Sequence, residues 1–218
     1  LCHEQKWETA HIMEHMALGA NQQYRSSRKF NAIFEQNGAY NNASTGPYDM
    51  NYIAECADFE WQRILELMLL AVSKPLFLEK EFKAEFGNVK EELVQRSNNH
   101  GNQLNLKLRE LYGFCSKTYQ DRLELIHNVS IDDIREHYRK THFTQNMRFV
   151  IAGNINPQKR KTMMRLIEKI ELEQGQVQRI IYPDERPTTL NKPLYIANKT
   201  VPNMYFYFDS FHASGRLS

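Results

Sequence analysis

Apolar residues recur at helical spacing in several parts of the chain and alternate with polar residues in others. Over residues 59–72 the apolar side chains share one face, and Pro75 ends the pattern, which predicts a helix. Residues 39–45 and 49–56 alternate instead, which predicts two paired strands. Further helices are expected over residues 11–16, 26–36, 79–98, 104–111, 134–139 and 157–172, and further strands over 147–153 and 203–209.

This order of elements predicts an α+β fold, with a mixed, largely antiparallel sheet covered by helices. We expect one domain over residues 1–180 and a linker, polar and proline-containing, over 181–194. Residues 195–218 would then supply the first strand or strands of a second, similar domain or of the same sheet. Because the chain begins with Leu1 rather than methionine, we expect it to be part of a longer protein.

The strongest chemical signal is the pentapeptide His11-Ile12-Met13-Glu14-His15. Residues four apart lie on the same face of a helix, so the two histidines can present their imidazoles to one metal ion. The glutamate borders the same face. Two imidazole ligands and a carboxylate that can take a proton from water are the groups that a catalytic zinc site uses.

A third protein ligand is needed, because catalytic zinc usually has three. Residues 78–94 repeat apolar side chains every three or four positions, which predicts an amphipathic helix rich in glutamate. Glu85 and Glu92 are seven apart and therefore share a face. Glu91 is the alternative ligand, but it is rotated by about 100° from Glu92 around a helix.

The order and spacing of these residues resemble the insulinase/pitrilysin family of zinc metallopeptidases, the inverzincins. The resemblance rests on His11-x-x-Glu14-His15, with Glu92 far downstream and Glu85 seven residues before it. It implies that His11, His15 and Glu92 bind one Zn²⁺ per chain and that Glu14 is the general base. It also implies that Glu85 supports the site from behind the ligands.

Other segments extend the resemblance to about residues 4–172. Residues 38–45 are similar to the family segment Gly-x-x-x-Asn-Ala-x-Thr, which implies a strand beside the metal helix whose open edge pairs with substrate. Asn42, with Ala43 next to it, would bind the peptide. Residues 146–154 resemble a core strand of the family. Residues 112–116 depart from it, because they lack the His-Pro-Tyr-Gly loop of many relatives.

The resemblance also implies two strands ahead of the metal helix, and we expect these to be missing from the chain. Composition adds a few exclusions. The formal net charge is only +2 and no basic run is interleaved with aromatic residues, so nucleic acid is not an expected partner. No apolar run approaches the roughly 20 residues that span a membrane. Three cysteines without a Cys-x-x-Cys pair favour a reducing compartment over a disulfide framework, so we expect a cytoplasmic protein.

These observations predict a zinc endopeptidase that hydrolyses peptides or unfolded protein segments. By the resemblance, a second homologous half or subunit completes the active site, so we expect weak or no cleavage by this chain alone. A homodimer is another expected partner arrangement. The alternative is a non-catalytic, peptide-binding or scaffold subunit of the same family. A purely structural zinc domain is disfavoured, because such sites are closed by four protein ligands, usually including cysteine.

Overall fold

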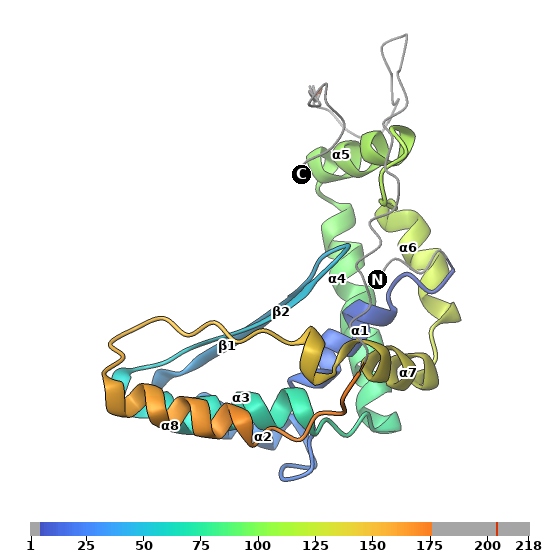
Figure 1. Cartoon of the computed structure of the whole chain (residues 1–218). Coiled ribbons are helices and arrows are strands. Elements are labelled where there is room, and N and C mark those ends of the chain that lie inside the picture. Colours follow the sequence, from blue (N-terminus) through green and yellow to red (C-terminus); the bar gives the residue numbers. More distant parts are fainter. Residues whose placement is uncertain (1–4, 176–203, 205–218) are drawn as a thin grey trace.

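In the computed structural model of the chain, residues 5–175 and Met204 are described. Helices make up most of this part, and one two-stranded sheet lies among them (Figure 1). The α-helices are α1 (Thr9–Ala17), α2 (Ser27–Phe34), α3 (Trp61–Ser73), α4 (Glu79–Ser97), α5 (His100–Leu111), α6 (Tyr119–Leu125), α7 (Ile131–Thr141) and α8 (Pro157–Glu168). Short 3₁₀-helices cover Gln36–Gly38, Asp58–Glu60, Ile126–Asn128 and Thr144–Asn146.

The sheet consists of β1 (Tyr40–Thr45) and β2 (Met50–Glu55), which pair antiparallel from Tyr40↔Glu55 to Thr45↔Met50. Both strands alternate between exposed and half-buried residues, as the sequence pattern predicts. The expected α+β class with an antiparallel sheet is therefore confirmed. In the described part of the chain, however, the sheet is small and helices dominate.

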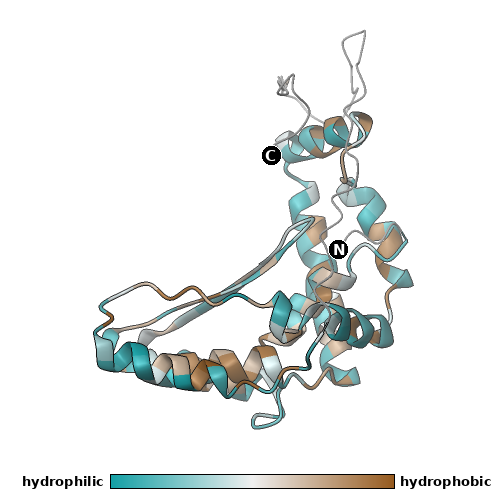
Figure 2. Cartoon of the chain, in the orientation of Figure 1, coloured by the Kyte–Doolittle hydropathy of each residue, from teal (hydrophilic) through white to brown (hydrophobic). Residues whose placement is uncertain are grey.

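The prediction of a strand over residues 147–153 is wrong. The backbone is extended at Met147 (φ −95°, ψ 141°), but no strand is formed from there to Gly153. A strand needs a hydrogen-bonded neighbour, and no described segment pairs with this one, which leaves Val150 92% exposed. Together with β2, the segment lines a groove of about 1440 Å³. Figure 2 shows hydrophobic residues along this extended trace.

Most expected helices are confirmed, with shifts at their ends. The helix around Leu104 begins earlier, at His100, because the Asn99 side chain accepts a hydrogen bond from the backbone N–H of Asn102. The helix around Ile134 begins at Ile131, because Ser130 and Asp133 form a capping box before α7. Helix α6 was not expected. The linker over 181–194 and the strand expected over 203–209 lie outside the described residues, apart from the exposed Met204.

Helix α1 lies at the centre of the larger hydrophobic core, between α4, α7 and β1. It contributes Ile12, Met13 and Met16, and α4 contributes Val89 and Leu93, all of them buried. A second cluster joins α2 to α3. This packing fixes the rotation of α1 about its own axis. The side of α1 that carries the histidines therefore faces α4.

Candidate metal centre

The two histidines of the pentapeptide lie on the face of α1 that points toward α4. His11 and His15 are one turn apart, and their ring centroids are separated by 5.0 Å with the ring planes at 80°. Both rings are partly shielded, with side chains 12% and 25% exposed. The apolar residues between and beside them, Ile12 and Met13, are fully buried. Core packing of α1 therefore fixes the direction in which the imidazoles point.

Glu92 of α4 completes a cluster of three residues that could hold a metal ion. Its Oε2 atom lies 3.4 Å from Nε2 of His11 and 3.6 Å from Nε2 of His15. One ligand atom from each residue lies within 4.8 Å of the other two. Two ligands at zinc distances of ~2.0–2.1 Å and a tetrahedral angle are separated by roughly 3.3 Å. The cluster therefore has the donor types and nearly the spacing that a tetrahedral zinc ion requires.

The electrostatics of the cluster favour a cation. Burial disfavours a charged imidazole, but hydrogen bonds to Glu8 and Glu92 more than compensate and raise the pKa of His11 to about 9. The hydrogen bond with His11 lowers the pKa of Glu92 to about 2, against the effect of burial, and Arg96 adds to the shift. The metal-free cluster therefore holds a proton on His11 at neutral pH, and a bound metal ion would replace that charge.

The neighbouring Glu91 is exposed and is not part of the cluster. It follows the helix geometry, which rotates it away from the histidines. The geometry therefore favours Glu92 over Glu91 as the third ligand.

Glu85, two turns before Glu92, faces His15. Its Oε2 atom lies 3.2 Å from Nδ1 of His15 and accepts a hydrogen bond from the Asn88 side chain at 3.1 Å. Partial burial tends to raise the pKa of Glu85, but these two contacts lower it overall. Glu85 therefore stays charged and contacts His15 through the ring nitrogen that points away from Glu92.

Glu14 lies on α1, which packs against β1, and is only 8% exposed. The hydroxyl group of Thr45, at the end of β1, donates a hydrogen bond to Glu14 Oε2. The sequence pattern indicates Glu14 but contains no signal that pairs it with Thr45.

The residues expected to bind substrate lie on β1. Asn42 is exposed, and its Oδ1 accepts a hydrogen bond from the backbone N–H of Ala43 at 2.9 Å. Ala43 is half-buried and pairs with Tyr52 of β2. The other edge of β1 has no strand partner within the described residues. A peptide-binding role for this strand stays a prediction.

Two further residues of the centre were missed from the sequence. Glu8 is completely buried, and its Oε2 lies 2.8 Å from Nδ1 of His11. Arg122 of α6 donates to both carboxylate oxygens of Glu8. Glu8 stands three residues before His11, a helical spacing that the sequence displays. Arg122 has no such signal, because it is 114 residues away and α6 was not expected.

Comparison with known proteins identifies the family. The family model described as Insulinase (Peptidase family M16) matches residues 4–122, more than half of the 218-residue chain. The chain belongs to the insulinase family, peptidase family M16. A sequence comparison with curated proteins gives no match.

Solved structures of proteases share the fold. A protease from Helicobacter pylori superposes with a TM-score of 0.70 at 22% identity, over 84% of this chain and 45% of that protein. Pitrilysin gives a TM-score of 0.65 at 18% identity, over 84% and 21%. The periplasmic protease PqqL from Escherichia coli gives 0.64 at 17%, over 82% and 21%. The chain thus spans less than half the length of these insulinase-family structures.

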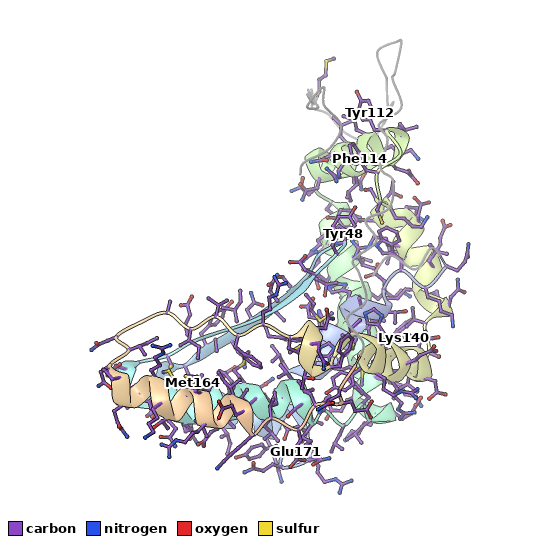
Figure 3. All side chains as sticks on the ribbon, in the orientation of Figure 1. Tyr48, Tyr112, Phe114, Lys140, Met164 and Glu171 are labelled. Carbon is purple, nitrogen blue, oxygen red and sulfur yellow. The ribbon has the colours of Figure 1, made fainter. Side chains whose placement is uncertain are left out.

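The departure from the family loop lies away from the centre. Figure 3 shows Tyr112 and Phe114 at the far end of α5, whereas the histidines belong to α1. Among the described residues, no helix is long and apolar enough to cross a membrane. The expectation of a reducing compartment loses its support from the cysteines. Cys115 is disulfide-bonded, while Cys56 is free and exposed. The cysteines therefore no longer favour a reducing compartment, and a cytoplasmic location stays a prediction without that support.

Proposed function

We propose that the chain is the zinc-binding part of an endopeptidase that hydrolyses peptides or unfolded protein segments. The observation that carries the proposal is the meeting of His11, His15 and Glu92 from two helices, with Glu14 adjacent on α1. Membership of a peptidase family supports the same reaction class.

In this proposal His11, His15 and Glu92 hold one zinc ion. Their two nitrogen donors and one carboxylate oxygen leave a fourth position free, which is the donor set of hydrolytic rather than structural zinc sites. A zinc ion held there would polarise the scissile carbonyl group and lower the pKa of a water molecule. Glu85 orients His15 through its hydrogen bond to Nδ1.

Glu14 is proposed to accept the proton of the attacking water and then to deliver it to the leaving amine. Its burial on α1 and the hydrogen bond from the hydroxyl group of Thr45 hold the carboxylate in one orientation. Thr45 leaves the second oxygen, Oε1, available for proton transfer, since the hydrogen bond that it donates goes to Oε2.

Substrate is proposed to bind as an added strand on the open edge of β1, near Asn42 and Ala43, where backbone groups can pair with an extended peptide. Because the chain spans less than half of the family structures that it matches, we propose that a second half or subunit completes the substrate site. The alternative is a non-catalytic, peptide-binding subunit.

The test compares the zinc-loaded chain with Glu14→Gln. Each protein is incubated at high concentration with casein, which is unfolded, and the new termini are identified by mass spectrometry. We expect slow cleavage by the parent chain and loss of cleavage in Glu14→Gln, with equal zinc content in both. The variant keeps the size and polarity of the side chain but cannot accept a proton as a carboxylate does.

Equal cleavage by the two proteins would refute the role of Glu14. No cleavage by either protein, at full zinc content and with casein bound, would agree with the need for a second half. Absence of casein cleavage by the zinc-loaded full-length protein would then favour the non-catalytic alternative. Rapid turnover by the chain alone would contradict the proposal that a second half is needed.

A further inference from the structure

A buried ion pair lies directly behind the metal-facing side of His11. Glu8 is 0% exposed, and its carboxylate meets the guanidinium group of Arg122 in a two-point contact: Nε to Oε1 at 2.6 Å and Nη2 to Oε2 at 2.8 Å. The Arg122 side chain is only 15% exposed. Removing two charges from water is costly, and their mutual attraction offsets that cost only where the geometry is excellent and further hydrogen bonds are made.

The orientation of the pair explains why charges stand there. The same oxygen, Oε2, contacts both Nη2 of Arg122 and Nδ1 of His11, each at 2.8 Å. The two-point contact fixes the plane of the carboxylate, because a guanidinium fork matches it in only one orientation. Oε2 is therefore held toward the imidazole.

A carboxylate at this position selects one form of the neutral ring. It accepts the Nδ1–H and leaves the lone pair on Nε2, the nitrogen that faces Glu92 at 3.4 Å. Outer carboxylates of this kind orient metal-binding histidines and increase their basicity. Glu85 makes the corresponding contact to His15 at 3.2 Å, so each histidine has its own carboxylate.

We propose that Glu8 and Arg122 form a positioning pair for His11, in which Glu8 acts on the imidazole and Arg122 acts through Glu8. The inference rests on the proposed zinc site. It makes α6 part of the metal centre: the pair ties α6 to α1 across 114 residues of sequence. Removing the pair lowers zinc affinity even where folding is retained.

The experiment replaces both charges together, so that neither is left buried alone. In Glu8→Leu/Arg122→Met the pair becomes apolar, a change that proteins often tolerate well. In Glu8→Gln/Arg122→Met an amide oxygen can still accept the Nδ1–H of His11. Zinc affinity is measured by competition with a chromophoric chelator, and folding by circular dichroism and urea unfolding.

We expect Glu8→Leu/Arg122→Met to bind zinc about 10- to 100-fold more weakly than the parent chain. Glu8→Gln/Arg122→Met should recover part of this loss, because it keeps the acceptor. The matched control is Glu60→Leu/Arg63→Met, which replaces the contact between another buried glutamate and an arginine, at the start of α3. It should change stability but leave zinc affinity unchanged.

Parent-like zinc affinity in a folded Glu8→Leu/Arg122→Met protein would overturn the proposal and leave the pair a purely structural contact. A second measurement does not depend on variants: the imidazole ¹H–¹⁵N NMR spectrum of the zinc-loaded parent chain. We expect His11 to carry a proton on Nδ1 and to bind the metal through Nε2, and binding through Nδ1 would overturn the proposal. A parent chain that binds no zinc would contradict the proposed function itself, which is a distinct result.

Discussion

Replacing Glu92 by glutamine tests the ligand set, with Glu91→Gln as the matched control on the adjacent position. The Oε2 atom of Glu92 lies 3.4 and 3.6 Å from the two imidazole nitrogens, whereas Glu91 is exposed. Loss of a residue that only orients a ligand lowers metal affinity about 10- to 100-fold. Loss of the anionic ligand itself should therefore cost at least about 100-fold, or roughly 2.7 kcal/mol of binding free energy.

The size of the loss of zinc affinity in Glu92→Gln should depend on pH. With a pKa of about 9, His11 in the metal-free chain is protonated at pH 7, and zinc must displace that proton. Proton competition then weakens apparent binding by about 100-fold at pH 7 relative to its limit above pH 9. Because Glu92 is one of the two groups that raise this pKa, its removal relieves part of the competition. The full loss should appear at pH 9 and a smaller one at pH 7.

Zinc affinities of the parent chain, Glu92→Gln and Glu91→Gln are measured by chelator competition at both pH values. Glu91→Gln should match the parent chain within about twofold, since surface substitutions of this kind have small effects. Parent-like affinity in Glu92→Gln at pH 9 would show that the proposed ligand set is wrong. A large loss in Glu91→Gln alone would transfer the role to that residue.

Three further predictions concern Glu85, Thr45 and His142. Glu85→Gln should weaken zinc binding about 10- to 100-fold, measured by the same competition, because the amide is a poorer acceptor for the Nδ1–H of His15; unchanged affinity would remove Glu85 from the site. Thr45→Val should leave zinc content unchanged and slow casein cleavage about tenfold or more, because a hydrogen bond to a charged group contributes ~1.5–3 kcal/mol; parent-like cleavage would show that the hydroxyl group does not orient Glu14. Burial, with a smaller contribution from a neighbouring histidine, lowers the pKa of His142 to about 4, below the roughly 6.5 of an unfolded chain. The contribution of His142 to the free energy of unfolding is therefore complete above pH 6.5 and falls by up to about 3 kcal/mol as the pH drops toward 4. In urea unfolding, the free energy of unfolding of His142→Gln should depend less on pH over this range than that of the parent chain. An equal pH dependence in the two proteins would refute the lowered pKa of His142.

The helices of the centre could be predicted because their signals are local. The pentapeptide places two histidines on one turn, and the apolar repeat of residues 78–94 places Glu85 and Glu92 on one face. The structure has both helices, with all these side chains directed to the same place. Periodicity predicts which face of a helix a residue occupies, and the resemblance to a family supplied the pairing of the two helices.

The parts that could not be predicted depend on contacts between distant segments. Arg122 reaches Glu8 across 114 residues, and α6, which carries it, has seven residues, too few for a clear apolar repeat. The apolar pattern of residues 147–153 indicates an extended backbone, but pairing depends on a neighbouring strand that the pattern does not contain. Thr45 could have been noticed only by knowing that the end of β1 lies against α1.

The most direct test of the account is the zinc content of the purified chain, measured by elemental analysis after exhaustive dialysis against metal-free buffer without chelator. The meeting of His11, His15 and Glu92 predicts one zinc ion per chain. A folded chain that retains no zinc, and that takes up none when zinc is added before dialysis, would contradict the proposed metal centre.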